Sequence, residues 1–207
     1  MQFAERTSAA GFMNRARMKS EMKKIVIGIS GASGAVYGIR LLEELKAAGA
    51  ETHLIISRWG EYTIEQETGQ SPDAVRALAA YNYDADDMAA PISSGSFPID
   101  AMAVVPCSMK TLAGIANGFS EDLIARAADV CLKERRQLIL AVRETPLSRI
   151  HIDNMLRATD AGAIIMPPMP AFYTKPASID EIVAQSVYRI AEKLGIDPGT
   201  ELKRWGE

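Results

Sequence analysis

The chain has 207 residues, of which 48% are hydrophobic and 24% are charged, a balance typical of one globular domain. Its 23 Lys and Arg residues against 26 Asp and Glu residues give a net charge of −3, which provides no basic surface for a nucleic-acid backbone. The chain has only two cysteines and two histidines, and no apolar run of about 20 residues. Zinc modules, disulfide-stapled folds and membrane spans are therefore excluded as well.

The first 21 residues differ in character from the rest of the chain. They carry four basic residues and lack the apolar core of about 7–15 residues that a secretory signal requires. The basic, serine-containing composition also suits a transit peptide, but Glu5 and Glu21 count against that interpretation. We expect residues 1–21 to be a disordered N-terminal extension and residues 22–207 to form the functional domain.

Short apolar, β-branched runs alternate with stretches of helical periodicity along the chain. We predict strands at 24–29, 52–57, 101–106, 137–142 and 163–166, and helices at 36–48, 61–67, from 111 onward, 123–135, 150–160 and 178–194. The run Ser178-Ile179-Asp180-Glu181 has the capping-box pattern that opens the last of these helices. Strands that are apolar throughout and alternate with helices predict an α/β domain with a doubly wound parallel sheet. In such sheets ligands bind at the carboxyl ends of the strands.

The first predicted strand runs into a glycine-rich turn with the spacing Gly28-x-x-Gly31-x-x-Gly34. Small residues let the backbone pass close to a ligand, and the N–H groups that begin the following helix can bind phosphate. The spacing is neither the dinucleotide fingerprint nor a P-loop. The second strand ends at Ser57, where a nicotinamide dinucleotide site usually carries an acid. These turns favour a mononucleotide, although tight packing alone could also explain the glycines.

Polar residues also follow the third and fourth strands. Ser108, Lys110 and Thr111 at the start of a helix offer hydroxyl and backbone donors for a second anionic group, or Ser108 is an ordinary helix cap. Arg143 and Glu144 directly follow the fourth strand, where the arginine suits phosphate and the glutamate suits acid–base chemistry. A salt bridge between the two is the alternative.

Two further segments invite a functional interpretation. The loop 166–176 holds four prolines with Phe172 and Tyr173, and it could form the wall of a ligand pocket or a subunit interface. The cluster Asp84-Ala85-Asp86-Asp87 resembles the magnesium–diphosphate carboxylates of some prenyl-transfer enzymes. Because it lies in a polar stretch, a solvated turn is the preferred interpretation.

Several motifs, in this order, resemble those of the UbiX/Pad family. They are Gly31–Ala35, Pro106–Leu112, Arg126–Val130, Leu132–Arg136, Arg143–Pro146, Pro170–Tyr173 and Arg204–Glu207. The resemblance extends over residues 23–207. It implies a single flavodoxin-like (Rossmann-like) domain.

The resemblance also implies an activity. Enzymes of this family join the dimethylallyl group of dimethylallyl phosphate to N5 and C6 of reduced FMN, without a metal. The product, prenylated FMN, is the cofactor of UbiD-type decarboxylases, so such an enzyme is the expected functional partner. A cytoplasmic homododecamer is expected. An FMN-dependent aromatic acid decarboxylase and a non-catalytic flavodoxin-like flavin-binding protein remain the alternatives.

Residue roles follow from the same resemblance. The residues expected to bind FMN are Gly31, Ala32, Ser33, Ser57, Ser108, Met109, Lys110, Thr111 and Arg143. The prenyl phosphate is expected at Tyr173, Arg189 and Lys133, with Trp205 near the site. Ser33 and Glu144 are expected to handle protons. Lys133 and Arg189 would stabilise the departing phosphate electrostatically, and an aromatic pocket would tolerate the developing cation.

Overall fold

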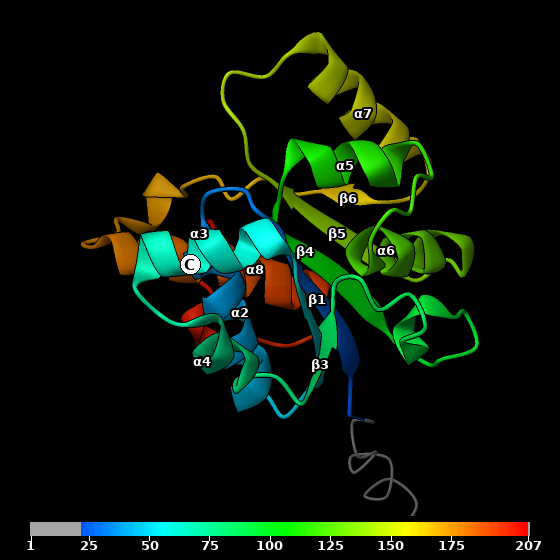
Figure 1. Cartoon of the computed structure of the whole chain (residues 1–207). Coiled ribbons are helices and arrows are strands. Elements are labelled where there is room, and N and C mark those ends of the chain that lie inside the picture. The colour runs from blue at the N-terminus through cyan, green and yellow to red at the C-terminus, as the bar shows by residue number, and fades with distance from the viewer. Residues whose placement is uncertain (1–21, 207) are drawn as a thin grey trace, which may run out of the picture.

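Six parallel strands form the centre of the protein in the order β3-β2-β1-β4-β5-β6 (Figure 1). The structure, a computed structural model, describes residues 22–206, so the expectation for residues 1–21 lies outside the described residues. The strands are β1 (Lys24–Ile29), β2 (Glu51–Ile56), β3 (Tyr81–Asp84), β4 (Ala101–Cys107), β5 (Gln137–Val142) and β6 (Ile164–Ile165). The helices are α2 (Ala35–Ala47), α3 (Arg58–Thr68), α4 (Pro72–Arg76), α5 (Met109–Ala116), α6 (Leu123–Lys133), α7 (Arg149–Asp160) and α8 (Ile179–Lys193), with short 3₁₀ turns η1 (Pro91–Ser93), η2 (Phe172–Thr174) and η3 (Gly199–Glu201).

The prediction of a doubly wound parallel sheet is confirmed, with one strand more than expected. The five predicted strands stand in the order second, first, third, fourth, fifth, which is the flavodoxin-like order. Strand β3 adds to the edge beside β2 and extends this to the order of dinucleotide-binding folds. It was not predicted because its side chains are mostly exposed, so it lacks an apolar run.

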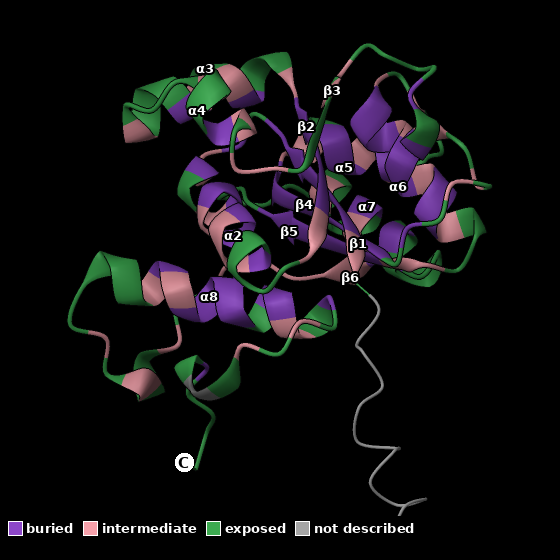
Figure 2. Ribbon diagram, turned by 90° about the horizontal axis from the view of Figure 1, so that it is seen from below, coloured by how far each residue is buried: buried purple, intermediate pink, exposed green. Residues whose placement is uncertain are grey.

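Two apolar cores lie on opposite faces of the sheet, because successive strand side chains point to opposite sides. In β1, Ile25, Ile27 and Ile29 face the core that α2 and α8 cover. Val26 faces the other core, which α5, α6 and α7 cover. Figure 2 shows the buried central strands and the buried inner faces of the helices, whose outer faces are exposed. This double cover explains why the central strands are apolar throughout.

The strand order reverses between β1 and β4, and one serine connects the two turns that follow these strands. Ser30 is 1% exposed, and its Oγ donates a hydrogen bond to the carbonyl of Pro106 at 2.7 Å. The backbone N–H of Ser108 in turn donates to Ser30 Oγ at 2.8 Å. The crevice where ligands bind in such sheets is therefore fixed at the ends of β1 and β4.

The start of α3 packs directly against the end of β1. A Cβ atom added to Gly60 would lie 2.5 Å from the carbonyl oxygen of Ile29, so this position requires glycine. The N–H of Ser57 donates to the same carbonyl at 3.0 Å. Helix α3 therefore begins at the same edge as the turn after β1.

The last helix, α8, begins as predicted at a serine cap. Ser178 accepts a hydrogen bond from the N–H of Glu181 at 3.2 Å. The carboxylate of Glu181 accepts from the N–H of Ala177, at 3.0 Å, rather than from that of Ser178. Only half of the expected capping box is therefore present.

Candidate functional site

A pocket of about 570 Å³, lined mostly by polar and charged residues, lies at the carboxyl ends of β1, β2 and β4, and we name it the nucleotide pocket. Its lining residues are Gly31, Ser57, Arg58, Trp59, Ala85, Asp86, Ser108, Lys110, Thr111, Glu121 and Asp122. Five of the residues expected to bind FMN, namely Gly31, Ser57, Ser108, Lys110 and Thr111, are thus brought together. They come from the turns after three different strands.

Three helices begin at this pocket. Ser57 caps α3 by accepting from the N–H of Gly60 at 3.1 Å, and Ser108 caps α5 by accepting from the N–H of Thr111 at 3.2 Å. Asp122 caps α6 in the same way. Helix N-termini carry partial positive charge and free N–H groups, which favour a phosphate. The serine-capped starts of α3 and α5 therefore fit the single phosphate of a mononucleotide, whereas the carboxylate of Asp122 already occupies the start of α6.

Two of the expected FMN-binding residues are engaged in other contacts. Lys110 Nζ lies 3.0 Å from Glu121 and 3.2 Å from Asp122. Partial burial disfavours its charge, but these two carboxylates outweigh that effect and raise the pKa of Lys110. The side chain of Met109 packs against the apolar core beneath α5. The pocket therefore offers its donors chiefly through hydroxyl and backbone groups.

A carboxylate occupies the start of α2, where the glycine-rich turn was expected to offer free N–H groups to phosphate. Glu67 accepts hydrogen bonds from the N–H groups of Gly34 at 2.8 Å and Ala35 at 3.1 Å. Burial acts to raise the pKa of Glu67, but the bonds from Ser33, Gly34 and Ala35, with the charge of Arg143, lower it overall. The expectation of free N–H groups at this helix is therefore wrong, because the protein supplies its own anion there.

Glu67 brings Ser33 and Arg143 into one polar group with it. Sequence reasoning missed Glu67, which is 33 residues from Gly34 along the chain. One feature of the sequence could have indicated this contact. Glu67 lies in the last turn of α3, where a negative charge interacts unfavourably with the dipole of that helix. The hydrogen bonds to the positive start of α2 offset this unfavourable interaction. Ala32, next to Ser33, is buried, with 8% of its surface exposed.

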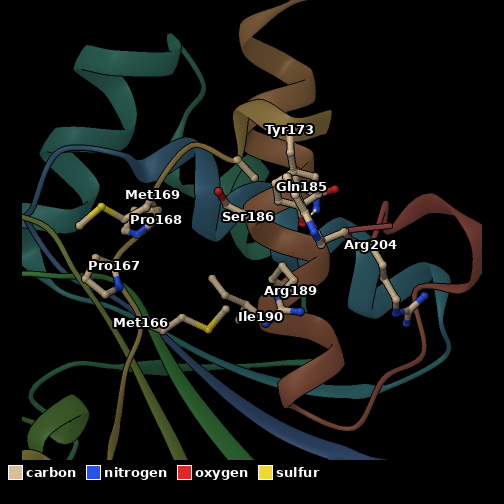
Figure 3. Close-up of a pocket in the computed structure, with 12 residues that line it drawn as sticks. Met166, Pro167, Pro168, Met169, Tyr173, Gln185, Ser186, Arg189, Ile190 and Arg204 are labelled. Atoms are coloured by element: carbon tan, nitrogen blue, oxygen red, sulfur yellow. Dashed lines mark hydrogen bonds between the residues drawn. The ribbon is translucent and has the colours of Figure 1, made fainter. Parts of the chain in front are cut away.

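A second pocket, of about 470 Å³, lies between α8 and the loop that follows β6, and we name it the C-terminal pocket (Figure 3). Its lining residues are Met166, Pro167, Pro168, Met169, Ala171, Tyr173, Gln185, Ser186, Arg189, Ile190, Arg204 and Trp205. Figure 3 shows Met166–Met169 on one side and the α8 residues on the other. Tyr173, Arg189 and Trp205, expected near the prenyl phosphate, are thus brought together.

The polar groups of the C-terminal pocket are connected to the end of the chain. Tyr173 Oη donates to the carbonyl of Lys203 at 3.2 Å, and Gln185 Nε2 donates to the same carbonyl at 2.9 Å. The rings of Tyr173 and Trp205 meet edge to face, with centroids 5.4 Å apart. Arg189 is half exposed and lies 3.4 Å from Glu192, so its guanidinium can reach a ligand in the pocket.

Six expected site residues line neither pocket: Ala32, Ser33, Met109, Lys133, Arg143 and Glu144. Lys133 is the last residue of α6, just before β5 begins. It therefore lies near the amino ends of the strands, whereas the nucleotide pocket lies at their carboxyl ends, and it pairs with Glu134. Arg143 and Glu144 lie in an exposed segment after β5, where Glu144 accepts from the N–H of Thr145 at 2.9 Å. Within this chain, Lys133 does not contact the other site residues.

The acidic cluster after β3 lies in an exposed turn. The N–H of Asp86 donates to Asp84 Oδ1 at 2.9 Å, and Asp86 reaches the rim of the nucleotide pocket. Between residues 22 and 206, no group of three or more Asp, Glu, His or Cys side chains is placed to hold a metal ion. In the same part of the chain, none of the helices is long and apolar enough to span a membrane.

Comparisons with known proteins agree on one family. A family model described as Flavoprotein matches residues 13–191. A probable UbiX-like flavin prenyltransferase of Bacillus subtilis is 52% identical over 195 residues, covering 91% of this chain and 95% of the relative. The crystal structure of AnUbiX (PadA1) with FMN and dimethylallyl pyrophosphate has a TM-score of 0.88 and 53% identity, covering 90% of this chain and 99% of that one. A dodecameric FMN-dependent UbiX-like decarboxylase of Escherichia coli O157:H7 has a TM-score of 0.86 and 48% identity, covering 89% and 100%.

The contact between Glu67 and the start of α2 predicts a pH-dependent stability effect. Glu67→Gln should lower the free energy of unfolding at pH 7 by about 0.3–1 kcal/mol, because the charge at the helix N-terminus is lost. The pKa of Glu67 is lowered in the folded state, so its contribution is present above the unfolded-state pKa and disappears as pH falls through the folded pKa. Urea unfolding at pH 7 and at about pH 3 measures this difference.

Glu65→Gln is the matched control, because Glu65 is an exposed acid on the same helix, whereas the N–H groups of Gly34 and Ala35 donate to Glu67. Its substitution should leave the free energy of unfolding unchanged at both pH values. An equal effect of both substitutions would show that Glu67 acts only through the overall charge of α3.

Proposed function

Since the chain belongs to the Flavoprotein family, and within it to the UbiX flavin prenyltransferases, we propose how its two pockets divide one reaction. The protein is a flavin prenyltransferase that uses FMN. The observation that carries the proposal is the C-terminal pocket. It combines a phenol, a guanidinium and a methionine- and proline-lined wall, which suit a small isoprenoid with an anionic head group.

The nucleotide pocket binds the acceptor. The caps Ser57 and Ser108, with Thr111 beside them, hold the phosphate of FMN through hydroxyl and backbone donors. Gly31 and Ala32 let the flavin approach the turn after β1 closely. When bound in its reduced form, FMN supplies the nucleophilic N5 and C6 positions that receive the prenyl group.

The C-terminal pocket binds and activates the donor. Arg189 pairs with the phosphate and stabilises its negative charge as the allylic C–O bond breaks. Tyr173 donates a hydrogen bond to the same group, for which its hydroxyl exchanges the carbonyl of Lys203 for a phosphate oxygen. The apolar wall from Met166 to Met169, with Trp205, keeps water from the allylic carbon.

Proton transfer falls to the groups near the ends of β1 and β5. Bond formation at C6 of the flavin releases a proton, and Glu144 is the proposed base that takes it. Ser33 is the proposed second proton-handling group, and its hydroxyl donates a hydrogen bond to Glu67, whose negative charge Arg143 also favours. Glu144 lies in an exposed segment, so a ligand or a neighbouring copy must bring it to the reacting atoms.

Lys133 takes part only in an assembly. Lys133 lies near the amino ends of the strands, away from both pockets. We therefore propose that it contacts the prenyl phosphate bound by another copy of the chain. A homododecamer like that of the Escherichia coli O157:H7 neighbour supplies such copies. The AnUbiX neighbour holds dimethylallyl pyrophosphate, whereas we propose the monophosphate as substrate, with Arg189 and Lys133 meeting one phosphate group. Delivery of the product to a UbiD-type decarboxylase in the cytoplasm completes the proposal.

Mass spectrometry of the flavin tests the reaction directly. After anaerobic incubation with reduced FMN and dimethylallyl phosphate, the flavin should gain the mass of one C5 prenyl unit, and parallel samples should compare the pyrophosphate. A flavin that returns unmodified with either donor would overturn the proposal in favour of a flavin-binding protein. Release of carbon dioxide from an aromatic acid by the purified protein would favour the decarboxylase.

Arg189→Ala should separate donor binding from FMN binding. Loss of a charge-assisted contact to the phosphate costs about 1.5–3 kcal/mol, so affinity for dimethylallyl phosphate should fall about 10- to 150-fold. The dissociation constant of FMN, measured by fluorescence titration, should stay unchanged. Lys193→Ala is the control, because Lys193 is an exposed cation on the same helix outside the pocket. Equal affinities for the donor in both variants would contradict the role of Arg189.

Glu144→Gln keeps the size of the side chain and removes the base. Turnover should fall by about 10²- to 10⁴-fold, while FMN and dimethylallyl phosphate still bind, because only proton transfer is affected. Single-turnover kinetics measure this, because they separate the rate of the chemical step from ligand binding. Turnover at the wild-type rate would remove Glu144 from the mechanism. If the variant unfolds, the carboxylate serves the structure instead.

Coexpression of Lys133→Ala with Arg189→Ala tests whether a site is shared between copies. Each variant alone should be nearly inactive. Random mixed assemblies should recover roughly a quarter of the wild-type activity, because sites with both intact residues form between unlike copies. No recovery above the single variants, in assemblies shown to be mixed by mass spectrometry, would place both residues in one chain's site or Lys133 in none.

A further inference from the structure

A largely exposed tryptophan stands at the rim of the nucleotide pocket, and the residue roles above do not use it. Trp59 lies in the first turn of α3, two residues after the cap Ser57, and 64% of its surface is exposed. It is the one large aromatic residue among those that line the pocket, whose other members are small, polar or charged. A bound flavin has a broad aromatic ring system that needs an apolar partner in this polar surrounding.

The backbone is built to receive this side chain. A Cβ atom at position 31 would lie 2.4 Å from the Cβ of Trp59, so the close approach of α3 to the turn after β1 requires Gly31. The glycine of the first turn therefore makes room for the base of the tryptophan. This contact fixes where the indole leaves the backbone, beside the two serine caps.

Neighbouring side chains hold the indole but leave it open. The rings of Trp59 and Tyr62 have centroids 5.8 Å apart at an interplanar angle of 81°. The guanidinium of Arg58 lies 5.9 Å from the centroid of the indole. Two-thirds of the residue nevertheless stays in water in the absence of a ligand, which is unfavourable for so large an apolar group.

We propose that Trp59 contacts the bound FMN, with the indole packed against the flavin and screening it from solvent on the α3 side. The inference rests on the proposed function, since it assigns a further residue to the same FMN pocket. In this proposal Gly31 is needed both for the close approach of the flavin and for the placement of Trp59. Trp59 is a binding residue in this proposal, and the protons and the leaving phosphate are left to other groups.

Trp59→Leu tests the contact by two binding readouts that do not require turnover. The dissociation constant of FMN should rise about 5- to 150-fold, the range expected when an aromatic stacking partner is removed. The fluorescence of the bound flavin, which an indole in contact quenches by electron transfer, should increase. Phe119→Leu is the control: Phe119 is 65% exposed and lines an adjoining groove, outside the nucleotide pocket. It should match the wild type in both readouts.

Trp59→Phe keeps an aromatic ring and decides the matter if the leucine variant fails to fold. It should retain most of the affinity for FMN, and the flavin fluorescence should still rise, because a phenyl group is a poor electron donor. Wild-type affinity and fluorescence in the folded variants would overturn the proposal. So would unchanged affinity together with a smaller assembly in sedimentation, which would show that a neighbouring copy covers Trp59.

The flavin mass in the same samples separates this inference from the proposed function. If the Trp59 variants bind FMN as tightly as the wild type and still yield prenylated flavin, only the role of Trp59 is contradicted. Wild-type protein that neither binds FMN nor prenylates it would count against the function itself.

Discussion

A single buried hydroxyl connects the two turns on which the nucleotide pocket depends. The strand order reverses between β1 and β4, and Ser30 bridges their ends by donating to Pro106 and accepting from Ser108. A buried hydroxyl that lost one of these partners would leave a polar group unsatisfied, at a cost of about 1–3 kcal/mol. Because both bonds are made, the cap of α5 is held in a fixed position relative to the glycine-rich turn. Together with the pairing of β1 and β4, these bonds hold the two turns that line the nucleotide pocket side by side.

The fold could be predicted from the sequence because its central strands are buried on both faces. All five predicted strands lie within one residue of their observed bounds, since a parallel strand covered on both sides is apolar throughout. Strand β3 and helix α4 escaped prediction because an exposed edge strand and a five-residue helix have little apolar periodicity. Ser57 and Ser108 could be placed in the site because they directly follow strands, and the ends of parallel strands meet at one edge.

Other parts of the site depend on contacts that sequence position does not encode. The approach of Glu67 to Gly34 joins the end of one helix to the start of another. The C-terminal pocket joins a loop, a helix and the chain end, and its ligand residues were expected only through the family resemblance. A matching motif, in turn, does not show where a residue lies. Lys133 belongs to a motif of the family, yet within one chain it lies far from Tyr173 and Arg189. Tertiary placement and assembly decide such contacts.

In the proposed donor site, the carbonyl of Lys203 competes with the donor phosphate for the hydroxyl of Tyr173. Tyr173 has one hydroxyl proton, so it can serve either the carbonyl or a ligand, and whatever stabilises one contact weakens the other. Gln185 keeps its own hydrogen bond to that carbonyl when Tyr173 leaves, so the exchange strands no acceptor. Directly after Lys203, Arg204 pairs with Glu192 of α8 at 3.0 Å, so this part of the chain is attached to that helix at a second point. Sequence changes in these last residues would then tune donor affinity without touching the flavin.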